Sequence, residues 1–586
     1  MGYELKKLFV SKSIFFLLFC FSLILLPELF AQQNRNVACS LQITAGTLKA
    51  NFMPPRVINI GKYDRIAFPD LPNYGKPGEP AMPVKTVKYL IPFGREIESV
   101  NVVWEKKEKI KGSFVIEPAQ RPIPLNYQGR IKSTLPDPLI YNSAQAFPGK
   151  LYSLVSIQQF KNYKIAIINL YPVEYQPLFK NLYYYRNLEL QINLKQAASH
   201  TVKKYSSDLK DIKAVKKFVD NSDVCLTYAD PEGIKKLANG QDDYEYVIIT
   251  SQELAASIQT YNFQALAAHK ASKWGLTTLI KTTESIYSNS EYSGLRPDGT
   301  EDNQTRIRNF IIDYAQNHNT KYVLLAGDGD AEEPAAQNGE TEIAPIIPHR
   351  GLSASYWNWD DGPVMITNND IPADLYYACL DGTFDADADG IYGEVADNVD
   401  FIAEVYVSRA PVDSETEMSN FVYKTITYEN SQADYLTSAY TIGEWLDNEY
   451  DEQYPEILIS TSWGKDFLEE IRLGTSANGY TTAGIGSSGY FNVQTLYDYD
   501  YDSNPEHYGD YNQGWLKPDL LNIMNSGVHV LNHVGHGNAD SICGYKQFTN
   551  FDADNLTNTD YFLGYTQSCY SGAFDNKSAI SEYEDE

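Results

Sequence analysis

Hydrophobic and polar positions alternate along residues 32–200. The stretches "IESVNVVWEKKEKIKGSFVI" and "LYYYRNLELQINLK" are rich in aromatic and β-branched residues set between polar ones, which is typical of β-strands. Prolines gather in "FPDLPNYGKPGEPAMPVK" and in "PAQRPIPL", where they suit strand edges and turns. This region is therefore predicted to be a β-rich, sandwich-like domain.

From residue 241 the pattern changes to short hydrophobic runs that alternate with stretches of helical period. Such alternation predicts a parallel sheet covered by helices on both faces. The pattern restarts near residue 438, so the fold class is predicted to be α/β with two doubly wound subdomains, 241–432 and 433–586. The second subdomain is expected to be incomplete at its C-terminus. The expected strands are 244–250, 276–281, 321–330, 403–412, 438–445, 490–498, 528–535 and 560–568, and the expected helices are 251–275, 301–319, 415–430, 463–474 and 517–527.

Two further segments have a character of their own. Residues 1–31 have Lys6, Lys7 and Lys12 near their start, continue with an apolar run of thirteen residues (14–26) and end at Ala31. They predict a secretory signal peptide; a membrane anchor is the alternative, but a spanning helix needs about 20 residues. Residues 201–240 are charged and turn-rich, so they are predicted to be a linker in which proteolytic activation cleavage occurs. No other stretch is apolar enough to span a membrane.

Charge and cysteine content limit the possible functions. The net charge is −28 and the pI is near 4.7, which argues against a nucleic-acid partner and permits a secreted or cation-binding protein. Removal of the signal peptide would leave five scattered cysteines, too few for a disulfide scaffold. An odd number in an exported protein indicates a reactive thiol. The five are Cys39, Cys225, Cys379, Cys543 and Cys569.

One histidine and one cysteine follow predicted strands. His536 follows "VHVLNHVG" and Cys569 follows "YFLGYTQS", and catalytic groups in open α/β sheets gather at such strand ends. If the two strands are neighbours, His536 can activate the Cys569 thiol. The backbone N–H groups of Gly537 and Cys569 can then face a developing oxyanion. A structural pair without chemistry is the alternative.

The other histidines and cysteines fit this picture less well. His533 and His536 lie three apart and point to opposite faces of a strand, which disfavours a shared metal ion. His529 and His533 are therefore assigned to packing. Cys543 is a rival nucleophile, but it is expected in a loop.

An acidic stretch, "DGTFDADADGIYGE", suits a divalent cation. Asp385, Asp387 and Asp389 alternate, Gly390 allows a sharp turn and Glu394 can complete a ring of oxygen ligands, which suits Ca²⁺. The alternative is a solvated acidic loop. The stretch "AGDGDAEEP" (326–334) is a weaker second candidate.

Taken in order, several motifs resemble the gingipain family of secreted bacterial cysteine peptidases. They are "YVLLAGDGDAEEPA", "DLYYACLDG", "EVYVSRAPV", "LNHVGHG" and "YFLGYTQSCYSGAFD". The region with "NYGKPGEPAMPVKTVKYLIPFG" resembles the family's inhibitory propeptide, which would make 32–200 a prodomain. The resemblance implies a caspase-like fold whose catalytic dyad lies in the second subdomain.

The resemblance also implies roles for single residues. It makes His536 the catalytic histidine, Cys569 the nucleophile and Gly537 an oxyanion donor, and it places an assisting carboxylate at Glu444. Known members cleave after Arg or Lys using an acidic pocket residue, but "WLDNEYDEQY" (445–454) offers several acids without a clean match. Members also bind calcium, in agreement with the Asp385 loop.

These observations predict a secreted cysteine endopeptidase made as a zymogen, acting on peptides and bound by its own propeptide, without an organic cofactor. One alternative is a non-catalytic, calcium-stabilised surface or adhesion protein on a peptidase scaffold. Another is an adhesin-processing or sorting peptidase of narrow specificity on the same fold.

Overall fold

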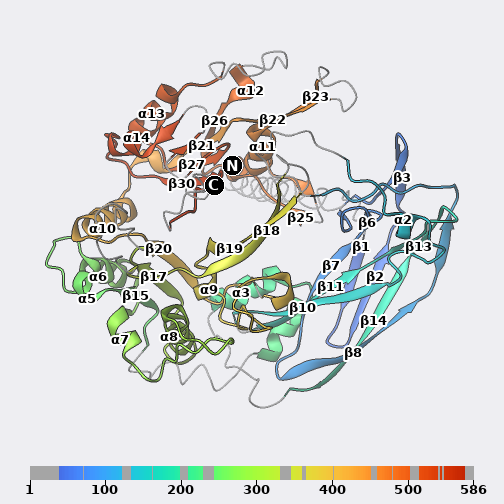
Figure 1. Ribbon diagram of the computed structural model, residues 1–586, viewed down its shortest axis with the longest axis horizontal. Coiled ribbons are helices and arrows are strands. Elements are labelled where there is room, and N and C mark those ends of the chain that lie inside the picture. Colours follow the sequence, from blue (N-terminus) through green and yellow to red (C-terminus); the bar gives the residue numbers. More distant parts are fainter. Residues whose placement is uncertain are drawn as a thin grey trace, which may run out of the picture.

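The computed structural model comprises a β-rich prodomain and two α/β subdomains, A and B (Figure 1). The predicted signal peptide and residues 201–208 and 229–240 of the predicted linker lie outside the described residues. Among those that are described, no helix is both long and apolar enough to cross a membrane. The structure describes residues 39–69, 71–121, 133–161, 163–197, 209–228, 243–329, 345–358, 364–399, 401–450, 458–477, 480–501, 514–538, 541–543 and 547–574.

Antiparallel sheets build the prodomain, as the alternating sequence predicts. The largest has the order β1-β2-β14-β8, and two three-stranded sheets, β10-β11-β7 and β12-β13-β9, share its hydrophobic core. In β14, Leu188, Leu190 and Ile192 point into the core. The elements are β1 (Cys39–Ile43), β2 (Thr47–Phe52), β3 (Arg56–Ile60), β4 (Tyr63–Ala67), β5 (Asn73–Tyr74), β6 (Met82–Pro83), β7 (Lys85–Leu90), β8 (Arg95–Trp104), β9 (Lys107–Ile110), α2 (Pro138–Tyr141), β10 (Tyr152–Phe160), β11 (Tyr163–Leu170), β12 (Val173–Gln176), β13 (Asn181–Tyr185) and β14 (Asn187–Gln196).

Part of the predicted linker packs on the prodomain. Helix α3 (Leu209–Phe218) and the 3₁₀ helix η2 (Ser222–Tyr228) form a hydrophobic cluster with β7 and β11. The Asn221 side chain donates to the Leu90 carbonyl oxygen at 2.8 Å, and the Tyr228 hydroxyl donates to that of Ile91 at 2.6 Å. Residues 209–228 are therefore a structured end of the prodomain body.

Subdomain A is a parallel sheet of order β16-β15-β17-β20. Alternate residues of β15 enter different cores: Val247 and Ile249 pack on the side of α8, and Ile248 packs with α6 and α10. The prediction of helices on both faces is confirmed. The elements are β15 (Tyr246–Thr250), α5 (Gln252–Ala255), α6 (Phe263–Trp274), β16 (Thr278–Thr282), α7 (Thr283–Tyr287), α8 (Asn303–Asn317), β17 (Tyr322–Ala326), β18 (Gly351–Asn358), β19 (Val364–Pro372), α9 (Leu375–Ala378), η4 (Val395–Asp397), β20 (Tyr406–Ala410) and α10 (Glu415–Asn430).

The predicted single helix over 251–275 is wrong. The Ser251 side chain caps the four-residue α5, the chain then leaves the helix, and the Asn262 side chain accepts from the Ala265 N–H to start α6. Gly275 ends α6 with a φ of 70°. The two capping side chains favour two starts over one continuous helix, because each satisfies N–H groups that a helix start leaves without partners.

Subdomain B repeats the design with the order β26-β21-β27-β30, again with parallel neighbours. Helix α13 packs in the core on one face and α11 in the core on the other. In both subdomains, the strand that comes first in the sequence (β15 or β21) is thus the second strand across the sheet. The elements are η5 (Asp434–Thr437), β21 (Ser438–Gly443), β22 (Trp445–Tyr450), β23 (Leu458–Trp463), α11 (Gly464–Leu473), β24 (Ser476–Ala477), β25 (Tyr480–Thr481), η6 (Ile485–Ser488), β26 (Asn492–Tyr497), α12 (Asp498–Tyr501), α13 (Lys517–Ser526), β27 (Val530–Val534), β28 (Ser541–Ile542), β29 (Phe548–Thr549), α14 (Asn550–Asp554) and β30 (Leu563–Gln567).

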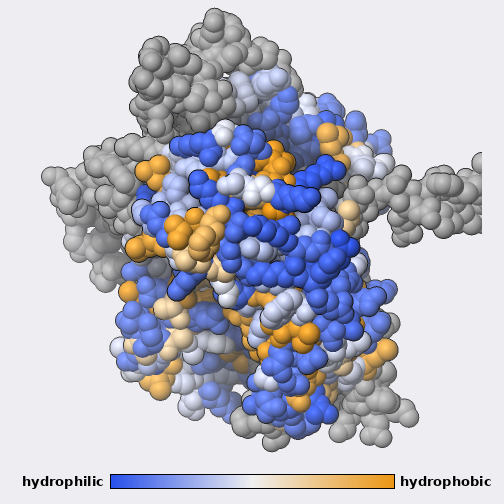
Figure 2. Space-filling model, turned by 90° about the vertical axis from the view of Figure 1, so that its right-hand side faces the viewer, coloured by the Kyte–Doolittle hydropathy of each residue, from blue (hydrophilic) through white to orange (hydrophobic). Residues whose placement is uncertain are grey.

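One prodomain side chain inserts into subdomain A. Lys161, at the turn between β10 and β11, is 6% exposed and adopts a φ of 55°. Its Nζ donates to the Glu404 carbonyl oxygen at 3.2 Å and lies 4.0 Å from the ring centroid of Tyr406. The outer face of the prodomain side is mostly hydrophilic, with hydrophobic patches separated from one another (Figure 2). Through its contacts with Glu404 and Tyr406, Lys161 is a buried polar anchor between the prodomain and subdomain A.

Candidate active site

Three candidate residues follow the carboxyl ends of three adjacent parallel strands in subdomain B. Glu444 comes directly after β21, His536 two residues after Val534 of β27, and Cys569 two residues after Gln567 of β30. Val534 pairs with Gln567, so the condition set by the sequence, that the two strands be neighbours, is met. Adjacent strands lie about 4.8 Å apart, so His536 and Cys569 emerge side by side.

Gly537 lies against the cysteine segment. A Cβ atom at Gly537 would lie 2.7 Å from Oγ of Ser568 and 3.0 Å from the carbonyl oxygen of Cys569. Only glycine allows this approach without displacing the neighbouring atoms. The turn that carries His536 is thus held directly on the segment that carries the thiol.

Glu444 is fully buried and contacts His533 of β27 and the backbone of His536. Its Oε2 accepts the backbone N–H of His536 at 2.8 Å and lies 3.1 Å from Nε2 of His533. Its Oε1 is buried and has no hydrogen-bond partner among the described residues. This carboxylate was predicted to assist His536, and it accepts a hydrogen bond from the backbone N–H of that residue.

Gly535 makes room for the buried carboxylate. A Cβ atom at Gly535 would lie 1.9 Å from Oε2 of Glu444 and 2.5 Å from Nε2 of His533. The N–H of Gly464 donates to the Glu444 carbonyl oxygen at 2.7 Å. Gly535 is therefore a steric requirement of the Glu444–His533 contact.

His533 takes part in a polar network that the sequence analysis missed. The residue is buried, in line with its assignment to packing, but its Nδ1 lies 2.7 Å from Oγ1 of Thr566, which lies 3.0 Å from Oγ of Ser568. The network connects Glu444 to the residue before Cys569. It depends on the pairing of His533 with Thr566 across β27 and β30, which local sequence patterns do not reveal. His529 makes other contacts: its Nε2 lies 2.7 Å from the Tyr428 hydroxyl and its Nδ1 lies 2.6 Å from the Leu436 carbonyl oxygen.

The His536 ring lies beside Trp445, with ring centroids 6.0 Å apart. The backbone N–H of Trp445 donates to Oδ2 of Asp498 at 3.0 Å. The acidic stretch that was expected to contain a specificity residue begins here; residues 451–454 lie outside the described residues. An acidic pocket residue for the substrate therefore stays a prediction.

Cys569 differs from the other described cysteines in exposure. It is half-buried, whereas Cys39, Cys225, Cys379 and Cys543 are buried. Partial burial raises the pKa of the Cys569 thiol above its ordinary value. The thiol form is thus favoured at neutral pH, and a base must remove its proton when it attacks.

This pKa shift predicts how alkylation of Cys569 depends on pH. Only the thiolate reacts, and a raised pKa keeps its fraction small at neutral pH, so the rate of reaction with iodoacetamide should rise about tenfold per unit between about pH 6 and pH 8. Peptide mapping of the intact zymogen at short reaction times measures this rate. A rate that is already constant below about pH 7 would instead indicate a preformed thiolate.

The predicted calcium ligands converge in the loop before η4. One ligand oxygen from each of Asp387, Asp389 and Glu394 lies within 4.8 Å of the others, and Asp385 and Asp387 form a second such group with Asp397. Asp385 is fully buried, and its Oδ2 has no hydrogen-bond partner among the described residues. Burial, and next the carboxylates of Asp389 and Asp387, raise the pKa of Glu394. These donors are all hard oxygens, so the residues fit Ca²⁺.

Asp397 is a member that the sequence analysis missed. Its Oδ1 accepts the N–H of Ala386 at 2.6 Å and its Oδ2 that of Glu394 at 2.9 Å, so it ties the two ends of the loop together. Its spacing of three residues after Glu394 could have indicated this capping contact. The weaker candidate, 326–334, lies partly outside the described residues, and its Asp328 accepts the N–H of Ile346 at 3.1 Å.

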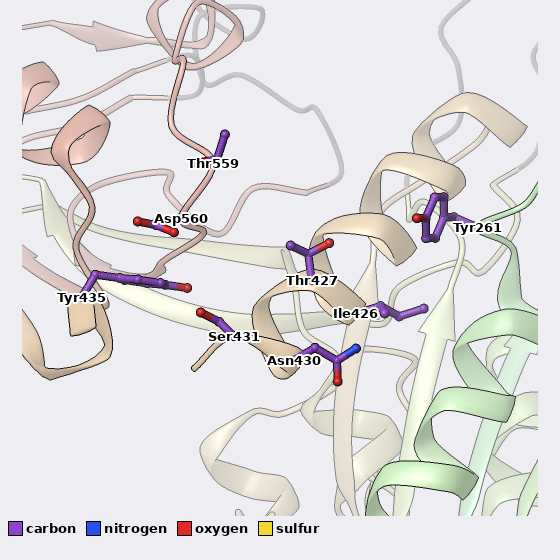
Figure 3. Close-up of a pocket in the computed structure, with 8 residues that line it drawn as sticks. All are labelled: Tyr261, Ile426, Thr427, Asn430, Ser431, Tyr435, Thr559 and Asp560. Carbon is purple, nitrogen blue, oxygen red and sulfur yellow. The ribbon is translucent and has the colours of Figure 1, made fainter. Parts of the chain in front are cut away.

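A pocket of about 390 Å³ lies away from these sites, between the two subdomains (Figure 3). Tyr261 and the end of α10 line one side, and Tyr435 and Asp560 line the other. It contains neither His536 nor Cys569, so it is not the candidate active site. Its lining residues are Tyr261, Ile426, Thr427, Asn430, Ser431, Tyr435, Thr559 and Asp560.

Comparisons with known proteins identify the family of the chain. The model of peptidase family C25 matches residues 239–584, and that of the C25 propeptide matches residues 51–223. No curated protein matches the chain. Similar solved structures include the Arg-specific cysteine proteinase gingipain R (RgpB), with 18% identity over 57% of this chain and 56% of that chain and a TM-score of 0.35. The complex of Porphyromonas gingivalis RgpB pro- and mature domains has 17% identity over 32% of this chain and 100% of that chain, with a TM-score of 0.27. The family model covers more than half of the chain, which therefore belongs to peptidase family C25.

Proposed function

We propose that this C25 peptidase is an exported cysteine endopeptidase, made as a zymogen, in which Cys569 and His536 hydrolyse peptide bonds. The observation that carries the proposal is the common strand-end placement of Glu444, His536 and Cys569, with Gly537 packed on the Cys569 segment. Residues 1–31 support export, to the outside or to the cell surface.

The proposed reaction has two halves. His536 accepts the thiol proton as Sγ of Cys569 attacks the scissile carbonyl carbon, and the N–H groups of Gly537 and Cys569 stabilise the oxyanion. The imidazolium returns the proton to the leaving amine. Water, deprotonated by the same imidazole, then hydrolyses the acyl-enzyme and regenerates the thiol.

In this proposal, Glu444 is a positioning residue for His536. The hydrogen bond that Glu444 accepts from the backbone N–H of His536 fixes the position of the backbone that carries the imidazole side chain. The contact of Glu444 with His533 connects Glu444 to the network that reaches Ser568. Fixing both catalytic groups before substrate binds reduces the entropy that must be lost in the transition state.

The experiment that tests the function is a peptide-library digest. The full-length protein, cut in the linker by an added protease, is incubated with a library randomised on both sides of the bond. Cleavage that an excess of thiol alkylator abolishes is expected, and the cleaved bonds report the specificity. No cleavage of any library, or cleavage that survives full alkylation, contradicts the proposal.

Docking of the prodomain should depend on Lys161. In the Lys161→Ala variant, the prodomain released by the activation cut should dissociate from the catalytic region about tenfold more readily, because about 1–2 kcal/mol of cation–π and hydrogen-bond energy is lost. Dilution of the cut complex, followed by the appearance of activity, measures this. The exposed Lys195→Ala is the matched control in the same domain. Equal dissociation of both variants would show that Lys161 is not an anchor.

We also propose that the Asp385 loop binds a structural Ca²⁺, with Asp385, Asp387, Asp389, Glu394 and Asp397 as candidate ligands. Saturating Ca²⁺ should raise the melting temperature of the wild type by about 5–10 °C relative to a chelator, as ligand binding at about 100 times the Kd stabilises by about 2.7 kcal/mol. The Asp385→Asn variant should lose this response, measured by calorimetry. Glu253→Gln, which removes an equal charge from an exposed site, should keep it. A Ca²⁺ response that survives Asp385→Asn would rule out Asp385 as a ligand.

A further inference from the structure

Three side chains of different chemistry meet inside subdomain B, close to the dyad. Glu444 follows β21, His533 lies in β27 and Cys543 follows β28. A carboxylate oxygen, an imidazole nitrogen and the thiol sulfur lie within 4.8 Å of one another. The three residues are 0%, 3% and 0% exposed. Neither His536 nor Cys569 belongs to this group.

One carboxylate oxygen of this group has no hydrogen-bond partner among the described residues. This oxygen is the buried Oε1 of Glu444. The other carboxylate oxygen, Oε2, faces Nε2 of His533. A buried carboxylate oxygen in this state is unfavourable unless a hydrogen bond or a cation compensates it. A bound cation would supply that compensation.

His533 is oriented in the way that metal-binding histidines are. Its Nδ1 lies 2.7 Å from Oγ1 of Thr566, and its Nε2 faces Glu444. A metal-binding imidazole donates the N–H of its second nitrogen to such a partner, which fixes the tautomer and directs the other lone pair to the ion. With Nδ1 protonated, the Nε2 lone pair and the Glu444 Oε2 would face each other at 3.1 Å, an arrangement that a cation stabilises.

We propose that Glu444, His533 and Cys543 form a binding site for a borderline-soft divalent ion of the Zn²⁺ type. Oxygen, nitrogen and sulfur donors together suit Zn²⁺ and its relatives and are foreign to Ca²⁺. Three protein ligands leave a further position of a tetrahedral ion for a small molecule such as water.

Binding has a defined proton balance and a route to the dyad. Cys543 binds as thiolate, so its S–H proton passes to solvent and binding weakens as the pH falls. Glu444 Oε2 also accepts the His536 backbone N–H. The ion would share a ligand with the group that positions the catalytic histidine, so its occupancy is coupled to the geometry of the dyad.

The test is titration of the full-length Cys569→Ala protein with Co²⁺ in excess Ca²⁺, because Co²⁺ reports its ligands spectroscopically and this variant lacks the dyad thiol. One equivalent should bind with a sulfur-to-cobalt charge-transfer band, and Zn²⁺ should displace it. Adding Cys543→Ser should remove the band and weaken binding at least about tenfold. Adding Cys379→Ser, a buried cysteine in subdomain A, should change neither.

Two results would overturn the proposal. One is the absence of a charge-transfer band in the Cys569→Ala protein, which would leave a proton as the compensating cation of the cluster. The other is a band that persists in the Cys543→Ser variant. If that variant does not fold, Zn²⁺ must slow the alkylation of Cys543 in the Cys569→Ala protein, followed by peptide mapping, and equal rates with and without Zn²⁺ would also refute the site.

Discussion

Replacing Cys569 with alanine should abolish peptide hydrolysis, lowering kcat/KM by at least about 10³-fold. The variant keeps the oxyanion donors and the fold but lacks the sulfur that forms the acyl-enzyme. The measurement compares variants that an added protease has cut in the linker, since the mutant cannot process itself.

The control for this result is another cysteine of the catalytic region. Cys379→Ala, buried in the core beside α8, should retain activity after correction for the folded fraction. Activity that survives in Cys569→Ala and falls in Cys543→Ala would instead identify the rival thiol as the nucleophile.

Gly535→Ala should be nearly as harmful, although it removes no chemical group. Its Cβ would overlap the Glu444 carboxylate and approach the His533 ring, so the Glu444–His533–His536 arrangement must move. We expect the free energy of unfolding to fall by about 3 kcal/mol and kcat/KM to fall about 10²-fold, because displacements of about 1 Å have such effects on catalysis. Urea unfolding and steady-state kinetics measure the two quantities.

Gly564→Ala is the matched control, because a Cβ atom there would find its nearest heavy atom, in Phe562, at 3.9 Å. This variant in β30 should differ little from the wild type. If the two variants behaved alike, close packing around the Glu444 carboxylate would not be a requirement of the site.

Much of the fold can be read from local sequence patterns. Period-two alternation predicts the prodomain strands, and short apolar runs between helical stretches predict both parallel sheets. The strand-end positions of His536 and Cys569 follow from the same patterns, because a glycine or serine after an apolar run indicates where the strand ends. Their adjacency becomes certain only with the pairing of β27 and β30.

The contacts within the site could not be predicted in this way. Glu444 and His533 are 89 residues apart, and Thr566 is 33 residues from His533. Such contacts depend on the strand order β26-β21-β27-β30, which no local period encodes. The hairpin of β22 and β23, which follows Glu444 directly, was not predicted either.

Subdomains A and B share a strand order, but the proposed chemistry lies in B. Residues at the strand ends of A serve a structural purpose: Asp328, after β17, accepts the N–H of Ile346, and Arg409, near the end of β20, forms an ion pair with Asp374 at 2.7 Å. Arg409 also lies 4.8 Å from the ring of Phe574, five residues after Cys569. Subdomain A thus supports the segment that carries the proposed nucleophile.

The most direct test of the central claim is a titration of activity against thiol labelling. The activated protein is treated with increasing amounts of iodoacetamide, and residual hydrolysis is plotted against the fraction of each cysteine modified, measured by peptide mapping. We predict that activity falls linearly with modification of Cys569 and reaches zero when one equivalent has reacted there. Hydrolysis that persists when Cys569 is fully modified, or that follows another cysteine, would contradict the account.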